Sequence, residues 1–477
     1  MPLARSPANK GQVADRRPGA SLHRHRHLLR WAPWGVLGSL LLLGWWWKAD
    51  CLGGGGWQGG EQFYRYCYSD LVTLWFGRGL ADGRIPYIDQ PLEYPPLIGV
   101  QIWIAALLAR EAGGGVIAFY NINAALNAGF VLTTLALLRH LEVPIRRQLW
   151  WAGAPPVALY AFLNWDPLAV LLLVVAVALH VRGRDTAAGV AAGLGAAAKL
   201  FPALLIPLVV IARLRQGNAV AAARHAGAAV LAWAAVNVPL ALAAPEGWSR
   251  FFELSRGRGA TSATLWALAD ELGILRLDRA ALNRASALAF AGGAVLILVM
   301  GLRRRSPAAA WSLLLPLLAW FLVTNKVFSP QFDLWLVPLL ALLLPGAGPF
   351  VAFVVADVAV FASEFAYLGQ RAGFGPFVGY GPLGAAVAVR AGVLVWIIVV
   401  AMRRPMPAPP AAASRAPPCL QDPTQNYSGS PRSFDLPGSS LERASSSAPG
   451  PQRQEPSHSR ASTTGLGNST PDQIGMK

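Results

Sequence analysis

Charged residues are scarce in this chain, at 14% of 477 residues, whereas hydrophobic residues make up 54%. The mean hydropathy is +0.42, and long apolar runs recur between Trp34 and Met402. Repeated apolar runs of this kind are typical of membrane-spanning helices. The composition therefore predicts an all-α polytopic membrane protein.

The signatures of several common chemistries are missing as well. The chain has no Walker loop, no HExxH, no paired CxxC and no GxSxG at a strand–helix turn. Although the formal charge is +17, the basic residues cluster beside apolar runs and near the two ends, and no basic face is interleaved with aromatics. Membrane topology explains this charge better than a nucleic-acid partner.

Only three cysteines are present, Cys51, Cys67 and Cys419. The first two fall in one loop, so they could form an outward-facing disulfide or stay as two small buried thiols. The first apolar run, Trp34 to Trp47, lacks an Ala-x-Ala-like site and reads as a signal anchor rather than a cleaved signal peptide.

Three regions follow from the pattern of apolar runs. Residues 1–30 and 405–477 lack hydrophobic periodicity and are expected to be disordered cytoplasmic tails. Residues 31–404 form the membrane domain, with about twelve crossings. The candidate spans are 32–47, 116–138, 149–163, 167–181, 187–198, 200–213, 219–243, 285–302, 308–324, 331–345, 347–367 and 381–402.

Several spans are shorter than the roughly 20 residues of a full crossing, and polar or proline-containing hinges separate them. These three hinges are NWDP at 164–167, KLFP at 199–202 and NKVFSPQ at 325–331. Polar turns at membrane depth are tolerated where they face protein or water. We therefore expect the three hinges to line one cavity.

The run from Pro95 to Leu108 could cross the membrane or only dip into it, and the positive-inside rule favours dipping. With the N-terminus inside and this run not crossing, twelve arginines fall in short inside connections, and only Lys199, Lys326 and Arg371 fall outside. The run is then a juxtamembrane helix. The larger outer loops are 48–115 and 244–284. The inside arginines are Arg139, Arg146, Arg147, Arg182, Arg184, Arg213, Arg215, Arg303, Arg304, Arg305, Arg403 and Arg404.

Three stretches of the chain together resemble glycosyltransferase family 87. They are YSDLVTLWFGRGL with DGRIPY and EYPPL, then NWDPLAVLLLVVAVAL with AAGLGAAAKLFPALLIP, and finally NKVFSPQFDLWLVPLLAL. The resemblance covers roughly residues 35 to 400. It implies a GT-C-like bundle that transfers sugars, mannose above all, from a polyprenyl-phosphate donor.

A family of this kind places its catalytic Asp in the first outer loop, where Asp70 stands. Inverting transfer needs a carboxylate to take the acceptor's proton, so Asp70 is the candidate base. An N-cap is the structural alternative, with Ser69 equally suited. Glu93, before Tyr94 and two prolines, is the second candidate, for orienting the acceptor or the base.

Cations near the hinges are candidates for meeting the charge of the departing phosphate. Lys199 and Lys326 stand at hinges, and Arg256 and Arg258 lie in the RGRGATS stretch of the second outer loop, where snorkelling to lipid headgroups is the alternative. The expected sugar and cavity residues are polar. They are Tyr94, Asn164, Asp166, Asn325, Ser329 and Gln331. For Asn164 and Asp166 in the NWDP turn, a helix cap is an equally plausible role.

We therefore expect an integral plasma-membrane enzyme that uses a polyprenyl-phosphate sugar, with its site on the extracytoplasmic side and both termini cytoplasmic. The acceptor would be lipid-linked or polymeric glycan. No cofactor is expected, and a divalent metal is neither required nor excluded. Arabinofuranosyl transfer is an alternative within the class, and a flippase or transporter of lipid-linked saccharide is one outside it. A transporter should show two matching halves, which this sequence lacks.

Overall fold

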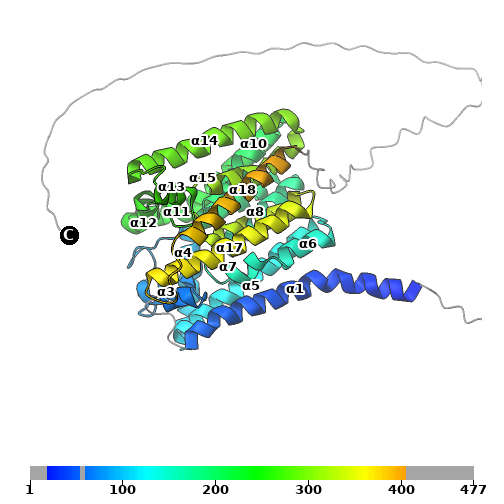
Figure 1. The fold of residues 1–477 in the computed structure, drawn as a ribbon. Coiled ribbons are helices and arrows are strands. Elements are labelled where there is room, and N and C mark those ends of the chain that lie inside the picture. Colours follow the sequence, from blue (N-terminus) through cyan, green and yellow to red (C-terminus); the bar gives the residue numbers. More distant parts are fainter. Residues whose placement is uncertain (1–18, 54–59, 404–477) are drawn as a thin grey trace, which may run out of the picture. The chain divides into compact units, whose positions relative to one another are not determined.

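The computed structural model describes residues 19–53 and 60–403. Within these ranges the chain consists of helices joined by turns and contains no β-strand (Figure 1). The expected tails fall largely outside, since residues 1–18 and 404–477 are not described. The first helix begins at Gly19, ahead of the boundary at residue 31 that the sequence suggested.

The described helices follow one another along the chain and are joined mostly by short connections, of which residues 78–95 form the longest. They are α1 (Gly19–Gly53), α2 (Glu61–Tyr64), α3 (Asp70–Gly77), α4 (Pro96–Glu111), α5 (Gly115–His140), α6 (Ile145–Ala152), α7 (Pro155–Tyr160), α8 (Asp166–Val181), α9 (Asp185–Ala198), η1 (Phe201–Leu204), α10 (Leu205–Arg215), α11 (Ala219–Ala243), α12 (Pro245–Gly257), α13 (Leu265–Glu271), α14 (Arg279–Arg304), η2 (Pro307–Leu313), α15 (Leu314–Thr324), η3 (Pro330–Trp335), α16 (Val337–Leu343), α17 (Ala347–Arg371) and α18 (Gly381–Arg403).

Six helical segments in the described part of the chain are long and apolar enough to cross a membrane: α5, α11, α14, η2 with α15, α17 and α18. Shorter helices such as α8 and α9 complete the bundle. These features confirm the all-α polytopic membrane class. Helix α4 has 16 residues and spans about 24 Å at 1.5 Å per residue, the same length as α8.

One expected span is wrong in its continuity. The run 149–163 is not a single helix, because it divides into α6 and α7 at Gly153 and Ala154. Pro155 and Pro156 follow directly, and proline has no N–H to continue the hydrogen-bonding of α6, although it suits the first turn of a new helix.

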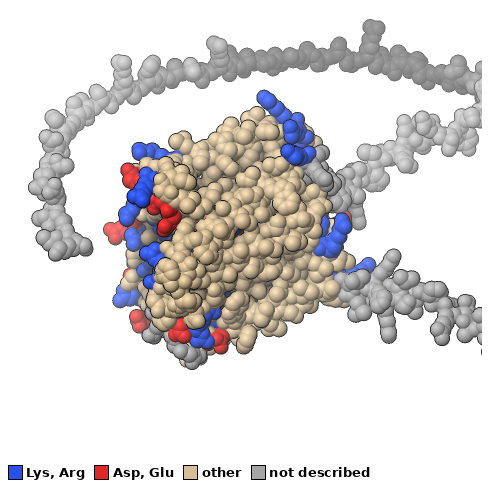
Figure 2. All heavy atoms as spheres, viewed as in Figure 1, with Lys and Arg blue, Asp and Glu red and all other residues tan. Residues whose placement is uncertain are grey.

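Charged side chains gather at the two ends of the helices (Figure 2). On the face shown, the band between the ends is almost entirely uncharged. Lys and Arg occur at both ends, whereas most of the visible Asp and Glu lie at the end that carries α3, α12 and α13. An uncharged band between charged ends is the surface that a lipid bilayer requires.

Helices α9 and α11 pack closely because α9 presents glycines at their contact. A Cβ added at Gly189 would collide with the carbonyl oxygen of His225, and one at Gly193 with that of Ala229. The two glycines are four residues apart and so lie on one helix face. Small residues at this spacing let membrane helices approach each other and gain close van der Waals packing.

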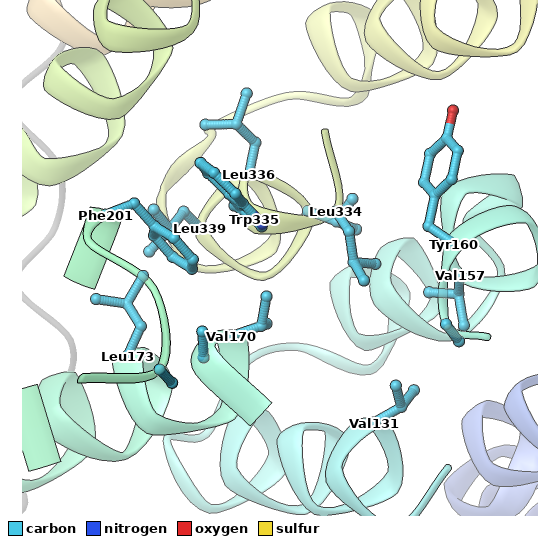
Figure 3. Packing of buried hydrophobic residues seen from close by; sticks show 14 of the residues in the cluster. Val131, Val157, Tyr160, Val170, Leu173, Phe201, Leu334, Trp335, Leu336 and Leu339 are labelled. Carbon is cyan, nitrogen blue, oxygen red and sulfur yellow. The ribbon is translucent and has the colours of Figure 1, made fainter. Parts of the chain in front are cut away.

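The core lies around η3 and α16, which pack against α7, α8 and η1 (Figure 3). The rings of Phe201 and Trp335 are stacked with centroids 4.1 Å apart. Val170 and Leu173 of α8 lie against them. This packing fixes the start of η1 relative to the end of η3, and so holds the KLFP hinge close to the element that follows the NKVFSPQ hinge.

A chain of buried amides fixes the NWDP hinge at 164–167. Gln101 of α4 donates to the side-chain oxygen of Asn127 at 3.1 Å. Asn127 of α5 then donates to the carbonyl oxygens of Ala161 and Asn164, at 2.9 and 2.7 Å. These carbonyls belong to the turn between α7 and α8, whose backbone is not helical and would otherwise lack partners.

Candidate active site

A cavity of about 550 Å³ opens among the three hinges, α3, α12 and α17, and we call it the main cavity. The short helices α8 and α9 begin and end beside it, respectively, which explains why they do not need the length of a full crossing. All three hinges contribute to its wall, as the sequence predicts. Their contributing residues are Asn164, Lys199, Leu200, Phe201, Asn325, Lys326, Val327, Ser329, Pro330 and Gln331.

Asp70 lines the main cavity at the start of α3. The cap of α3 is Ser69, whose hydroxyl oxygen accepts the Leu71 N–H, so the Asp70 carboxylate is not needed for capping. The Tyr68 hydroxyl donates to one Asp70 oxygen and the Tyr94 hydroxyl to the other, both at 2.5 Å. The carboxylate is therefore held in one orientation.

Opposing effects set the acidity of Asp70. Burial raises the pKa of its carboxyl, whereas the hydrogen bonds from Tyr68 and Tyr94 and the charge of Lys199 act to lower it. The Asp70 charge raises the pKa of Tyr68, and burial with the same charge raises that of Tyr94, so both hydroxyls stay protonated donors. The pKa of the Asp70 carboxyl is raised overall, with burial as the largest cause, and both of its oxygens accept hydrogen bonds from tyrosine hydroxyls.

Glu93 also lines the main cavity but already has a cationic partner. Arg78 binds it through Nε at 2.9 Å and Nη2 at 2.8 Å. This forked ion pair joins the end of α3 to the segment that precedes α4. Glu93 therefore supports the loop around Asp70 and adds a negative charge to the cavity wall.

Lys199 projects from the C-terminal end of α9 into the main cavity. Its ammonium forms an ion pair with Asp166, which is fully buried behind it and does not line the cavity. Three aromatic rings surround the ammonium, those of Tyr94, Phe332 and Trp335, with centroids 5.3 to 5.8 Å away. Asp166 thus holds the Lys199 ammonium in place. Because an ammonium has three N–H donors, the ion pair leaves donors for a ligand.

Lys326 lines the main cavity too, yet its ammonium bonds backbone oxygens. It donates to the carbonyls of Arg258 at 2.6 Å and Arg256 at 3.3 Å. These bonds tie the end of α12 to the third hinge. The side chain of Arg256 does not line the cavity, whereas Arg258 does, and among the described residues its guanidinium has no hydrogen-bond or ion-pair partner.

The expected polar residues of the cavity wall differ in which of their hydrogen-bonding groups are already paired. Tyr94, Ser329 and Gln331 line the main cavity, as do Asn164 and Asn325, whose side-chain oxygens accept backbone N–H groups of their own turns. The Asn164 side-chain nitrogen is buried without a partner within the described residues. It is therefore a donor available to a ligand in the cavity.

The sequence reading missed Tyr68 and Glu364, both of which line the main cavity. Tyr68 was detectable as the aromatic neighbour of Ser69 and Asp70. Glu364 is one of two carboxylates in the apolar helix α17, the other being Asp357, and intramembrane carboxylates usually mark function. It is 5% exposed and accepts the Ser262 hydroxyl at 2.7 Å.

A buried ionic network lies beside the main cavity. Arg390 of α18 is paired with Asp333 of η3 at 3.1 Å and donates to the Ala263 carbonyl at 2.6 Å. The guanidinium also lies 3.6 Å from the centre of the Phe328 ring. The network connects α18 to the third hinge and to the second outer loop, so it holds the wall in place.

The described ranges hold no group of three or more His, Cys, Asp or Glu placed to bind a metal ion.

Cys51 of α1 and Cys67 form a disulfide with their Cα atoms 6.1 Å apart. This bond attaches the segment before α3 to the end of α1, and it decides between the two alternatives the sequence left open.

A comparison with family models matches residues 92–330 to a model described as Glycosyltransferase family 87. The matched half of the chain contains Glu93, Lys199 and Lys326, whereas Asp70 precedes it. The searches of curated proteins and of solved structures gave no match. The matched segment covers two of the three hinges in full and the third up to Pro330, and it spans half of the chain. This chain therefore belongs to glycosyltransferase family 87.

Proposed function

We propose that the main cavity catalyses inverting transfer of a glycosyl residue from a polyprenyl-phosphate donor to a lipid-linked or polymeric glycan. The observation that carries the proposal is that Asp70, which does not cap its helix, lines the same cavity as Lys199. A base for the acceptor and a cation for the phosphate are the two groups that this reaction needs.

In the proposed reaction an acceptor hydroxyl oxygen attacks C1 of the donor sugar from the face opposite the phosphate. Its proton passes to the Asp70 carboxylate while the bond between C1 and the phosphate oxygen breaks. The bonding pair leaves on the phosphate, whose charge Lys199 and Arg258 stabilise. Asn164, Asn325, Ser329 and Gln331 supply hydrogen bonds to sugar hydroxyls, and Glu93 keeps the loop of Asp70 in place through Arg78.

An apolar groove of about 320 Å³ supports a lipid-linked donor. Pro96 lines the groove, and the preceding Pro95 lines the main cavity, so the two are neighbours. The groove runs between α4 and α11, and its walls include Ile88, Val100 and Leu240. It offers a polyprenyl chain an apolar path while the phosphate lies in the polar cavity.

We place the main cavity on the extracytoplasmic side of the plasma membrane and the termini in the cytoplasm. The opposite ends of the helices carry Arg146, Arg184 and Arg304, as the positive-inside rule expects for cytoplasmic connections. The visible acidic residues gather at the end that carries the cavity helices α3 and α12 (Figure 2), which agrees with this orientation.

Mannose is the leading sugar through the family resemblance, and arabinofuranose is the alternative. Membership of a glycosyltransferase family favours catalysis over a flippase. The test uses purified chain in proteoliposomes with radiolabelled polyprenyl-phosphate mannose and, in parallel, the arabinofuranosyl donor. Label should pass from one donor to a glycan acceptor. Movement of an intact donor across the bilayer without transfer would overturn the proposal.

A further inference from the structure

A second cavity of about 470 Å³ adjoins the main cavity, between α13, the start of α14 and the end of α17. Leu368 of α17 lines both cavities. Ser262 lines the second cavity and donates to Glu364, which lines the main cavity. The two spaces therefore meet at Ser262, Glu364 and Leu368.

One buried group at this junction has an unused hydrogen-bonding atom. The Ser262 hydroxyl donates to Oε1 of Glu364, whereas Oε2 of Glu364 has no hydrogen-bond partner among the described residues. An unpartnered buried carboxylate oxygen is costly, so its partner is expected to be a group that enters the cavity. A hydroxyl of a bound molecule fits, because a carboxylate accepts hydrogen bonds.

The second cavity combines aromatic faces with carboxylates. The Trp266 N–H donates to the Thr324 carbonyl at 2.9 Å, which fixes the position of its ring. Tyr367 and Tyr380 pack edge to face with centroids 5.6 Å apart. Asp270 and Glu271 are exposed at the wall of the cavity. Its volume falls in the range of about 300–1,000 Å³ that is usual for small-molecule sites.

We propose that the second cavity binds the part of the acceptor glycan beyond the sugar that receives the transfer. Pyranose rings have apolar C–H faces that suit aromatic rings, and they carry hydroxyls that donate to carboxylates. Arg279 and Arg371 line the same wall as the two carboxylates, so the charges of the wall balance and a neutral, hydroxyl-rich ligand suits it better than an ion. The acceptor is then an oligosaccharide or longer. This inference rests on the proposed function.

The experiment compares acceptors of increasing length. Transfer from radiolabelled polyprenyl-phosphate mannose to octyl mannoside, mannobioside and mannotrioside is measured with the full chain and with Asp270→Ala/Glu271→Ala. The control is Glu246→Ala/Glu253→Ala, which removes the same charge from exposed positions of the same outer loop that line neither cavity. Binding of the free sugars and of maltotriose is followed by saturation-transfer NMR in a detergent without a sugar headgroup.

The wild type should use the trioside better than the monosaccharide, and the cavity variant should lose about tenfold or more in kcat/KM for the trioside alone, as expected for lost hydrogen bonds to charged groups. Equal losses for both acceptors, or no loss, would overturn the inference.

If the wild type transfers to no acceptor, the proposed function fails and NMR decides the inference separately. A trisaccharide that binds more tightly than its monosaccharide, and only with the two carboxylates intact, supports the site. If no trisaccharide binds more tightly than its monosaccharide, or if glycerol phosphate displaces the bound sugar, the inference is refuted.

Discussion

The Tyr94 hydroxyl donates a 2.5 Å hydrogen bond to one oxygen of the Asp70 carboxylate. Tyr94 lies just before α4 and Asp70 opens α3, so the bond joins the starts of these two helices. Each oxygen of Asp70 carries one tyrosine donor and keeps a further lone pair. The carboxylate is therefore oriented before any acceptor arrives and can still take its proton.

Tyr94→Phe should move the pH dependence of transfer. The Tyr94 hydrogen bond lowers the pKa of Asp70, so its loss raises that pKa. Activity needs the deprotonated base, and the acidic limb of the kcat/KM profile should then shift to higher pH. Tyr120→Phe is the control, because it loses a buried hydrogen bond to the Trp45 carbonyl away from the main cavity. A pH profile equal to that of wild type in Tyr94→Phe would contradict this role.

Lys199→Ala should lower kcat/KM by about 10²-fold or more, as is typical for loss of one donor in a preorganised site. It also leaves Asp166 buried without its cation, which can destabilise the fold by about 3–5 kcal/mol. The double variant Lys199→Ala/Asp166→Asn removes that charge and separates the two effects. Transfer at the wild-type rate by a folded double variant would show that Lys199 serves only to neutralise Asp166.

Arg390→Leu should destabilise the protein by about 3–5 kcal/mol, because it leaves Asp333 buried and uncompensated. The measurement is reversible unfolding in mixed micelles. Arg284→Leu, at an exposed position of α14, should change stability by less than about 0.5 kcal/mol. Comparable losses in the two variants would mean that the Arg390 ion pair does not stabilise the wall of the cavity.

Impermeant maleimide should label single cysteines from outside intact cells at Asp82 and Glu253, and should fail at Arg146 and Arg304. The first two positions lie in the outer loops and the last two in connections placed inside by their positive charge. A Cys419→Ser background leaves the Cys51–Cys67 disulfide unreactive. Labelling of Arg304→Cys from outside would invert the proposed orientation.

Much of the fold was predictable because long apolar runs leave few choices in a membrane. The break between α6 and α7 was missed, although Pro155 and Pro156 carry a strong signal, because the run 149–163 stays apolar across it. The α9–α11 contact depends on which face Gly189 and Gly193 present, and that requires the packed helices.

The candidate site was partly predictable from the sequence. Hinges contain the polar residues of an apolar chain, so Lys199, Asn325 and Lys326 stood out, and the structure brings them to one cavity. Partners could not be predicted, since Asp166 behind Lys199 and the backbone carbonyls bound by Lys326 are set by tertiary contacts. Glu364 was overlooked because it is distant in sequence from each hinge.

The most direct test of the central claim is the transfer rate of purified Asp70→Asn protein. Asn keeps the shape of Asp but cannot accept the acceptor's proton, so the variant should insert and fold while transfer falls by about 10²- to 10⁴-fold. Asp82→Asn, at an exposed position of the same loop outside the main cavity, should keep full activity. Wild-type transfer by correctly folded Asp70→Asn would contradict the assignment of Asp70 as the base, and Glu93 would be the next carboxylate to test.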